Sequence, residues 1–310
     1  MQQLAKYIGN YSSRLESYLD KYFEKKLKEA SDINLKLSDL YAYLHKYILG
    51  GKKIRGALVE IGFEMYSTKA NSAITSVSSA IEILHSGLLI QDDWIDRDSS
   101  RRNLESAHLK FNPEIAVVLG DLAYFEAFKI ISGSDFEDFK KVKALTLLSK
   151  YLSNTGLGEV LDILGDNPNI VNIYKTAHYS FVMPLSIGAV LASATESDLE
   201  MLKKYGEAVG LAFQIRDDIL NIVGDPAVTG KNILSDITSR KKTFIWNFAV
   251  SKKAFDLVHD TPEEIKQKFI ECGAIDYAQK KAAEYAETAK RFVTNPLLAE
   301  LADFVITRNK

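Results

Sequence analysis

The sequence predicts an all-α protein, a bundle of ten or more helices in a single domain. Apolar residues recur with a helical period along most of the chain, and strand-like alternation of apolar and polar residues is scarce. The 310 residues include only six prolines, and no Gly/Ser-rich linker divides them. Because 46% of the residues are apolar, the chain can bury a large core. We therefore expect residues 1–310 to form one domain.

One long helix is predicted to run from about residue 74 into the segment that follows residue 90. Ile74, Val77, Ile81, Leu84 and Leu88 follow one another at intervals of three and four residues, which puts them on one helix face. Five other helix starts are predicted from capping sequences: Asn112-Pro113, Ser134-x-x-Glu137, Ser197-x-x-Glu200, Thr261-Pro262-x-Glu264 and Asn295-Pro296.

Composition narrows the classes of function. The chain has 39 basic and 41 acidic residues, so its net charge of −2 gives no bulk field for binding nucleic acid or an anionic membrane. The single cysteine, Cys272, forms no internal disulfide and no zinc cage, which favours the reducing cytoplasm. The N-terminus lacks the apolar region of a secretory signal. The longest apolar stretch, Phe181–Ala194, contains Pro184 and is too short for a transmembrane segment.

A first acidic motif, Asp92-Asp93-x-x-Asp96, continues the long apolar helix. Asp92 and Asp96 are four residues apart, so their carboxylates share a helix face and repel each other unless a cation lies between them. Mg²⁺ suits this position because it prefers oxygen ligands and often combines one or two carboxylates with substrate phosphates. A solvated acidic face is the alternative for a single such motif. The pair Arg101 and Arg102 follows closely, however, and suits direct contacts to a metal-bridged diphosphate.

A second acidic motif, Phe213-Gln214-x-x-Asp217-Asp218, lies 125 residues further along. Gln214, Asp217 and Asp218 form one polar patch on an otherwise apolar helix. Aspartate pairs on two buried helices can face each other and hold several Mg²⁺ ions around one diphosphate, which would neutralise the leaving group. Gly206 and Gly210, upstream on the same helix, indicate close packing against a neighbour.

Basic residues gather in short segments that suit phosphate groups. Gly50-Gly51-Lys52-x-x-Arg55 combines a glycine turn with cationic side chains, although such a sequence is often only a surface turn. Lys175-Thr176, Gly230-Lys231 and Lys241-x-Thr243 are weak signals individually. His85 lies two helical turns before Asp92, and a single histidine on an apolar face is more often a core residue.

Taken in order, these motifs resemble those of the trans-isoprenyl diphosphate synthases, the polyprenyl synthetase family, and most of all the archaeal-type geranylgeranyl and polyprenyl diphosphate synthases. The resemblance runs from about residue 50 to residue 243 and includes Glu82-x-x-His85 and Gly158-Glu159-x-x-Asp162. It implies a helical bundle around a deep central cavity and a cytoplasmic homodimer.

The resemblance also implies roles for the motif residues. The ligands of two or three Mg²⁺ ions would be Asp92, Asp93, Asp96, Asp217 and Asp218. The allylic diphosphate would be held by Arg101, Lys175, Thr176, Gln214, Lys231 and Lys241. Isopentenyl diphosphate would be held by Lys52, Arg55, His85 and Arg102. The residues most directly involved in catalysis would be Asp92, Asp96, Asp217, Lys175 and Lys231.

The implied reaction joins an allylic diphosphate (dimethylallyl, geranyl or farnesyl) head-to-tail to isopentenyl diphosphate, giving an all-trans prenyl diphosphate and diphosphate. In relatives a bulky aromatic residue about five positions before the first aspartate stops the growing chain. Gly87 occupies that position here and leaves room, with Leu88 beside it and Leu84 one turn below as a floor. We therefore expect a product of C20 or longer, with geranylgeranyl diphosphate as the leading expectation.

The sequence departs from the family pattern at four positions. Gln91 stands where histidine is common, Asn103 and Arg240 stand where glycine is usual, and Asn221 replaces the third aspartate of the second motif. Asn103 also tolerates a left-handed turn. Asn221 removes one negative charge from the expected metal site.

Three other functions are compatible with parts of the pattern. A class I terpene cyclase also uses an aspartate-rich helix, but it needs no second diphosphate site, so Lys52, Arg55 and Arg102 argue against it. A non-catalytic partner subunit would be expected to lose aspartates or arginines, and both sets persist here. A helical scaffold would require seven motifs to align by accident.

Overall fold

The computed structural model describes residues 2–69, 71–224, 234–256 and 260–309 and confirms the all-α class. The prediction of ten or more helices is confirmed. The helices are α1 (Gln2–Ile33), α2 (Leu35–Leu49), α3 (Ile54–Glu64), α4 (Ala73–Ile95), α5 (Ala107–Lys110), α6 (Pro113–Ser132), α7 (Asp138–Ile163), α8 (Pro168–Val171), the π-helix η1 (Asn172–Val182), α9 (Met183–Leu191), α10 (Glu196–Val223), α12 (Ser235–Thr238), α13 (Phe244–Ser251), α14 (Pro262–Glu271), α15 (Ala274–Lys290) and α16 (Pro296–Thr307). Two short strands, β1 (Ser100–Arg101) and β2 (Leu104–Glu105), pair antiparallel.

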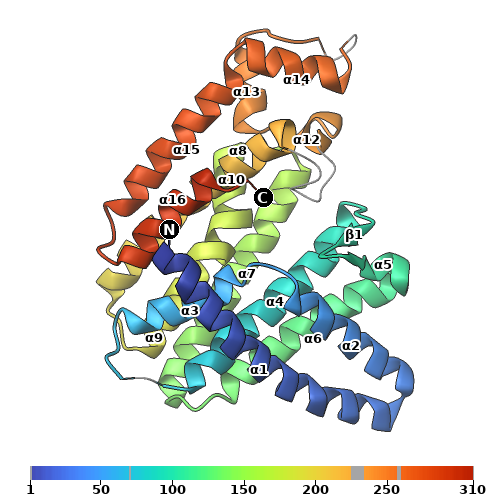
Figure 1. The fold of residues 1–310 in the computed structure, drawn as a ribbon, viewed down its shortest axis with the longest axis vertical. Coiled ribbons are helices and arrows are strands. Elements are labelled where there is room, and N and C mark those ends of the chain that lie inside the picture. Colours follow the sequence, from blue (N-terminus) through green and yellow to red (C-terminus); the bar gives the residue numbers. More distant parts are fainter. Residues whose placement is uncertain (1, 70, 225–233, 257–259, 310) are drawn as a thin grey trace.

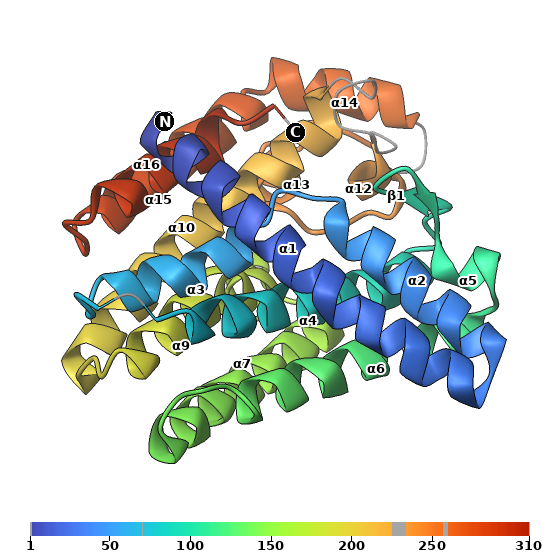
Figure 2. The same cartoon turned by 60° about the horizontal axis from the view of Figure 1, so that its bottom comes forward.

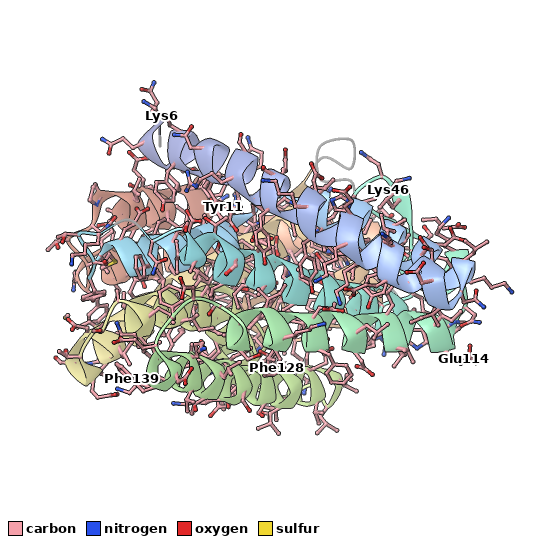
Figure 3. All side chains as sticks on the ribbon, turned by 90° about the horizontal axis from the view of Figure 1, so that it is seen from below. Lys6, Tyr11, Lys46, Glu114, Phe128 and Phe139 are labelled. Atoms are coloured by element: carbon pink, nitrogen blue, oxygen red, sulfur yellow. The ribbon has the colours of Figure 1, made fainter. Side chains whose placement is uncertain are left out.

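The helices pack in layers. In Figure 3, α1 lies on one side of α3 and α4, while α6 and α7 lie on the other side, with Tyr11 of α1 and Phe128 of α6 labelled. Helices α10, α15 and α16 pack together along the remaining flank (Figure 2). In Figure 1, α4 leads into β1 and α10 leads towards α12 at the same end of the bundle, so both acidic motifs come to that end. The deep central cavity and the single-domain organisation stay predictions.

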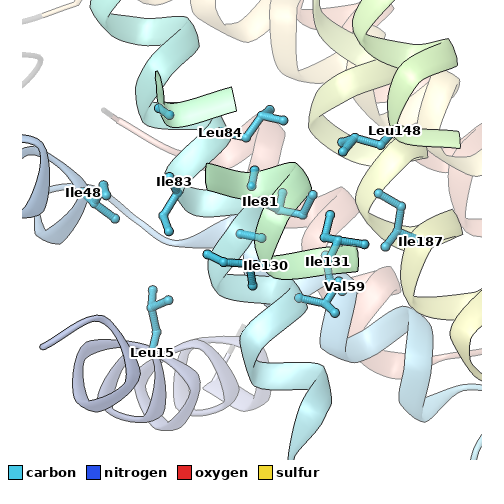
Figure 4. Packing of buried hydrophobic residues seen from close by; sticks show 14 of the residues in the cluster. Leu15, Ile48, Val59, Ile81, Ile83, Leu84, Ile130, Ile131, Leu148 and Ile187 are labelled. Carbon is cyan, nitrogen blue, oxygen red and sulfur yellow. The ribbon is translucent and has the colours of Figure 1, made fainter. Parts of the chain in front are cut away.

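Helix α4 lies at the centre of the main apolar core. Figure 4 shows Ile81 and Leu84 of α4 among Val59 of α3, Ile131 of α6 and Ile187 of α9, and all five are at most 1% exposed. Burying each such side chain contributes about 1.5–3 kcal/mol. This packing confirms the apolar face predicted from the spacing of residues 74–88, and it fixes the helix that carries the first acidic motif.

Judged by length and composition alone, helix α4 is long enough and apolar enough to cross a membrane. Within the bundle, 72% of its apolar window is buried against protein. A mostly buried helix of this kind is typical of a protein core, and Figure 4 shows its neighbours. The stretch Phe181–Ala194, the longest apolar run of the sequence, covers the end of η1, all of α9 and three residues beyond it, and it is mostly buried.

Three of the predicted helix starts are confirmed by their hydrogen bonds. Asn112 accepts from the backbone N–H of Ile115 at 2.7 Å, Thr261 forms a capping box with Glu264, and Asn295 caps α16. Such caps satisfy backbone donors that have no partner within the helix.

Two predicted starts were wrong. The segment Ser134-x-x-Glu137 forms no capping box, because the Ser134 hydroxyl donates back to the carbonyl of Ile131 and α7 begins at Asp138. The expected box at Ser197 is displaced, since Thr195 and Asp198 form the box two residues earlier. Both errors arose because several hydroxyl and carboxylate residues near a helix start compete for the same backbone donors.

The π-helix η1 packs very closely between α7 and α10. A Cβ atom added to Gly158 of α7 would lie 2.2 Å from the backbone nitrogen of Lys175, and one added to Gly210 of α10 would lie 2.3 Å from the Ala177 side chain. These glycines therefore let the three helices approach, as predicted for Gly206 and Gly210. The close packing fixes the segment that carries Lys175 and Thr176.

Candidate active site

The first acidic motif occupies the last turn of α4. The backbone N–H of Asp96 donates to the carbonyl of Asp92, so the helix ends at the motif. The Asp92 side chain is 29% exposed, and Asp96 is exposed. Although the residue is exposed, protein atoms around its carboxyl group displace part of the water, and this desolvation, followed by the charge of Asp92, raises the pKa of Asp96 to about 6; the positive charges of Lys175 and Lys241 offset part of this effect. The structure thus brings both lysines near the first motif.

Asp93 points in a different direction. It is fully buried, its Oδ2 accepts from the Tyr47 hydroxyl at 2.8 Å, and its Oδ1 pairs with the Nε of Arg101. Both carboxylate oxygens are therefore engaged away from the face of Asp92 and Asp96. These contacts make Asp93 the residue that orients Arg101, and its role as a metal ligand stays a prediction.

Arg101 and Arg102 of the β1–β2 hairpin contact different parts of the molecule. Its two turn residues, Arg102 and Asn103, are both left-handed, with φ of 56° and 61°, so the expectation that Asn103 tolerates this conformation is confirmed. Arg101 also lies 3.6 Å from Asp92. Arg102 instead donates to the carbonyl of Tyr47 at 2.7 Å and packs against the backbone of Gly50–Gly51.

A cluster of Arg55, His85 and Arg102, here called the arginine cluster, forms beside the Gly50–Gly51 turn. Arg55 Nη1 lies 3.1 Å from His85 Nε2, and Arg55 Nη2 donates to the hydroxyls of Tyr179 at 2.8 Å and Ser180 at 2.7 Å. Burial, followed by the charges of Arg55 and Arg102, lowers the pKa of His85. His85 is therefore neutral near pH 7, and its Nε2 accepts from Arg55.

Two polar atoms in this cluster are buried with no hydrogen-bond partner among the described residues: the Nε of Arg55 and the Nδ1 of His85. Buried polar atoms are costly when they are unsatisfied. A ligand or solvent that accepts from Arg55 would remove this cost, as the oxygen atoms of a diphosphate can.

Lys52, which follows the Gly50–Gly51 turn, lies over Phe304 of α16. Its side chain is exposed, and its Nζ lies 5.8 Å from the ring centroid of Phe304 in α16. Lys53 is instead buried, at 4% exposure, and burial lowers its pKa to about 8. The role of Lys52 in binding isopentenyl diphosphate stays a prediction.

A second group of cations, here called the paired cluster, consists of Arg101, Lys175 and Lys241. Lys175 Nζ lies 2.8 Å from Glu159 and 2.7 Å from Asp162, both on α7, and Lys241 Nζ lies 3.1 Å from Asp162. Burial opposes ionisation of Asp162, but the charges of Lys241 and Lys175 outweigh it and lower its pKa. Each cation of this cluster therefore has a carboxylate of the chain as a partner. The predicted residues Gly230 and Lys231 lie outside the described residues.

The second acidic motif lies on α10 and is connected to η1. Gln214 accepts from the Thr176 hydroxyl at 3.0 Å and donates to Asp218 at 3.0 Å. Asp218 is only 3% exposed, and its burial, followed by the charge of Asp236, raises its pKa. Asp218 therefore holds Gln214 in place, and its role as a metal ligand stays a prediction.

Asp217, by contrast, is 37% exposed and pairs with Arg308 from the C-terminal end of the chain. Asn221, at the position of the missing third aspartate, accepts from the backbone N–H of Asp236 at 3.1 Å. The side chain at this position thus holds the segment of α12 in place.

These oxygens suit a hard divalent cation. Burial and, after it, the charge of Asp92 raise the pKa of Asp96, and a cation between the two carboxylates would relieve their repulsion. Among the described residues no three His, Cys, Asp or Glu side chains gather closely enough to hold a metal by themselves. Mg²⁺ usually completes its coordination with water and substrate phosphates, so the donor set fits it.

Comparison with known proteins agrees with this geometry. The polyprenyl synthetase family model matches residues 37–281, most of the chain. The chain belongs to the polyprenyl synthetase family. It is 32% identical to a geranylgeranyl pyrophosphate synthase of Geoglobus acetivorans, over 87% of this chain and 91% of that protein. It is 30% identical to the farnesyl diphosphate synthase of Escherichia coli, over 85% of this chain and 87% of that protein.

The fold of this polyprenyl synthetase is also that of a solved structure. The geranylgeranyl pyrophosphate synthase of Corynebacterium glutamicum, solved with isoprenyl diphosphate and magnesium, superimposes with a TM-score of 0.85 and covers 98% of this chain and 99% of that chain at 24% identity. Family membership makes the chain a prenyltransferase of the prenyl diphosphate synthase type, for which a divalent metal is the expected cofactor.

The structure corrects the interpretation of Gly87. A Cβ atom at this position would lie 2.7 Å from the carbonyl of Gly120, 2.8 Å from the side chain of Ala123 and 3.0 Å from the ring of Tyr124, all on α6. Gly87 therefore allows close packing of α4 against α6 and leaves no open space for a product. Leu84 is fully buried in the core, and Leu88 is partly buried.

Several neighbours of the predicted polyprenyl synthetase site were not foreseen from the sequence. Tyr47, Tyr179 and Ser180 orient the arginines, and Tyr124 covers Gly87. Glu159 and Asp162 were noted as part of a family pattern, but their pairing with the lysines was not predicted. These residues belong to helices distant in sequence, and no local spacing signals their contacts.

Proposed function

We propose that this prenyltransferase catalyses the Mg²⁺-dependent head-to-tail condensation of an allylic diphosphate with isopentenyl diphosphate, giving an all-trans prenyl diphosphate of C20 or longer and free diphosphate. The proposal rests on one observation: the two arginines of the β1–β2 hairpin lie in different clusters. Arg101 lies with the acidic motif and the paired cluster, whereas Arg102 lies with Arg55 and His85. Two separate groups of cations suit two separate diphosphates, and a condensation needs both.

The carboxylates that would hold two or three Mg²⁺ ions are Asp92, Asp96 and Asp217. When bound, the ions would neutralise negative charge on the departing diphosphate. Arg101, Lys175 and Lys241 would bind its oxygen atoms, and Thr176 and Gln214 would add hydrogen bonds; the same role is proposed for Lys231. Charge stabilisation at the leaving group is then the main source of rate enhancement.

The arginine cluster would hold isopentenyl diphosphate so that its double bond faces C1 of the allylic substrate. Arg55 and Arg102 would donate to the diphosphate, with Lys52 joining from the glycine turn. Holding both reactants in place replaces an encounter in solution with an intramolecular step. Apolar side chains around the reacting carbons would keep water from capturing the allylic cation.

The expected chain length rests on similarity to a geranylgeranyl pyrophosphate synthase, since the argument from space at Gly87 does not hold. The limiting surface would be made by Leu88 and Leu84 of α4 together with Tyr124 of α6. Tyr124 donates to Gln91 at 2.5 Å, and burial followed by the charges of Asp121, Tyr179 and Asp92 raises its pKa. The ring of Tyr124 therefore lies next to the first acidic motif.

A cytoplasmic homodimer is also proposed. Large apolar side chains are exposed along α6 and α7, which lie side by side on one outer face of the bundle (Figure 2). They include Val118, Phe125, Phe139, Val142 and Leu157, each between 55% and 66% exposed. A patch of this kind marks an interface, and light scattering should give twice the mass of the chain. The net charge of −2 gives no basis for a nucleic-acid partner.

One assay tests the reaction. Labelled isopentenyl diphosphate is incubated with dimethylallyl, geranyl or farnesyl diphosphate, with and without Mg²⁺, and the product length is measured. We expect Mg²⁺-dependent elongation to C20 or beyond. Elongation that stops at C15 contradicts the chain length alone, whereas no elongation with any primer contradicts the proposed reaction. Geranylgeranyl diphosphate supplied alone should stay unchanged, since release of a hydrocarbon or alcohol would indicate a cyclase.

A further inference from the structure

The end of the chain reaches the second acidic motif. Helix α16 ends at Thr307, and the backbone N–H of Arg308 caps it by donating to the carbonyl of Phe304 at 3.0 Å. Arg308 is only 8% exposed, although it lies two residues before the last position of the sequence. A buried guanidinium is costly unless a charge partner compensates it.

That partner is Asp217. Arg308 Nη2 lies 2.5 Å from Asp217 Oδ1 and 3.2 Å from the carbonyl of Phe213, and the guanidinium lies 3.8 Å from the centroid of the Phe213 ring. The carbonyl of Arg308 also accepts from Arg216 Nε at 2.9 Å. Side chain and backbone of Arg308 are thus both held by the turn of α10 that carries the motif.

A metal ion can compete with Arg308 for the carboxylate of Asp217. Asp217 is 37% exposed, so its carboxylate is accessible to an ion arriving from the side away from Arg308. The Nε of Arg308 is buried without a hydrogen-bond partner among the described residues, so the arginine is not fully satisfied in this position. A divalent ion bound by Asp217 would lie close to the guanidinium, and the two positive charges would repel each other.

We propose that Arg308 is a built-in counter-ion of Asp217, which a divalent metal displaces, so that metal binding and release of the last turn of α16 are coupled. The inference rests on the proposed function, in which Asp217 is a metal ligand. Coupling of this kind is reciprocal: the metal weakens the Arg308 contact by the factor by which Arg308 weakens metal binding. The last turn of α16 also includes Phe304, whose ring Lys52 lies over. Release of this turn would therefore also change the surroundings of Lys52 in the basic glycine turn.

The first measurement is Mg²⁺ binding by calorimetry in the presence of inorganic diphosphate, with the full chain and its Arg308→Gln variant. Arg308→Gln should bind Mg²⁺ about threefold to tenfold more tightly, because the competing charge is gone. Arg291→Gln is the matched control, since Arg291 is an exposed arginine at the end of α15, and its affinity should equal that of the native chain. Unchanged or weaker binding in Arg308→Gln relative to this control overturns the inference.

The second measurement needs no variant. Hydrogen exchange of residues 304–309 in the native chain should become faster when Mg²⁺ and diphosphate are added, and slower exchange would overturn the inference. The two proposals fail differently. If native and variant chains bind Mg²⁺ equally well and make product, only the coupling is wrong; if the native chain neither binds Mg²⁺ with diphosphate nor makes product, the proposed function fails and the coupling with it.

Discussion

The arginine cluster and the paired cluster are both built from three side chains at the same end of the bundle, yet their partners differ in charge. In the paired cluster, Lys175 and Lys241 contact carboxylates of α7, and Arg101 contacts Asp93. In the arginine cluster, Arg55 and Arg102 donate to hydroxyls, to a neutral histidine and to a backbone carbonyl. Among the described residues, no carboxylate forms an ion pair with Arg55 or Arg102.

This difference indicates how each cluster receives an anion. Arg55 and Arg102 have no carboxylate in direct ion-pair contact among the described residues, although the buried Glu82 lies near enough to act on Arg102, so a diphosphate can bind there directly and gain charge-assisted hydrogen bonds. In the paired cluster, the carboxylates of the chain already neutralise the cations. A diphosphate must compete with them, which it can do when it arrives with its own metal ions. We therefore expect isopentenyl diphosphate to bind without Mg²⁺ and the allylic diphosphate to require it.

Replacing Asp92 with alanine should have the largest effect. The metal ions beside the paired cluster would lose a ligand, and kcat should fall by about 10³-fold, because charge stabilisation of the leaving group contributes several kcal/mol. Binding of isopentenyl diphosphate, measured by calorimetry, should stay within about twofold of native. Asp39→Ala on the exposed face of α2 is the control. A parallel loss of isopentenyl diphosphate binding would show that the two clusters are one site.

Two glutamine variants should separate the substrates. Arg55→Gln should raise the KM for isopentenyl diphosphate by about 10–100-fold, because a hydrogen bond from a charged group is worth about 1.5–3 kcal/mol. Lys175→Gln should act mainly on the KM for the allylic substrate and on kcat. Steady-state kinetics with each substrate varied in turn will check this. Equal effects of both variants on both substrates would contradict the division.

Acid should weaken metal binding beside the paired cluster. The pKa of Asp96 is raised to about 6 by burial and by Asp92, so Asp96 becomes protonated as pH falls below that value. A protonated carboxyl is a poor metal ligand, and the apparent affinity for Mg²⁺ should fall by up to about tenfold per pH unit below 6. The affinity of the arginine cluster for isopentenyl diphosphate should change less over the same range. Titration at pH 5, 6 and 7 measures both.

Product length tests whether Tyr124 limits chain growth. Tyr124→Ala should lengthen the main product by at least one isoprene unit, because the ring that covers Gly87 is removed. Tyr124→Phe keeps the ring and loses only the hydrogen bond to Gln91, so its product should match the native one. Chromatography of the dephosphorylated products gives the result, and identical products from all three proteins would show that Tyr124 does not limit growth.

Stability should respond in opposite ways in the two clusters. Asp162→Asn should lower the free energy of unfolding by about 1–3 kcal/mol at pH 7, because Lys175 and Lys241 lose their charged partner. The folded-state pKa of Asp162 is lowered, so its contribution is complete above its ordinary value of 3.8 and is lost as pH falls through the folded-state value. The difference between native and variant should therefore shrink below about pH 4.

Arg55→Gln is the counterpart, since it removes a cation whose partners carry no negative charge. The free energy of unfolding should stay within about 0.5 kcal/mol of native or rise, although substrate binding is weakened. Denaturant unfolding of both variants provides the comparison. A large loss of stability in Arg55→Gln would mean that its contacts with Tyr179 and Ser180 are chiefly structural.

The sequence alone determined the elements with a local cause. The apolar face of α4, the caps at Asn112, Thr261 and Asn295, and the aspartates at one-turn spacing are all recognised from the spacing of residues two to four positions apart. The ordered motifs also led to the family, because their types and spacing are set by the substrate chemistry. The two wrong capping boxes mark the limit of local reasoning, since neighbouring hydroxyls compete for the same donors.

Only the tertiary structure decided which way the site residues point and what holds them. Asp93 lies next to Asp92 in sequence, yet a tyrosine from α2 and an arginine from the hairpin turn it into the core. Gly87 has no side chain, and residues of α6 occupy the space where a side chain would lie. Arg308 lies 91 residues from its partner Asp217. Such contacts depend on how whole helices pack. Packing is decided by the combined shape and charge of segments far apart in the sequence, and the spacing of residues within one segment does not predict it.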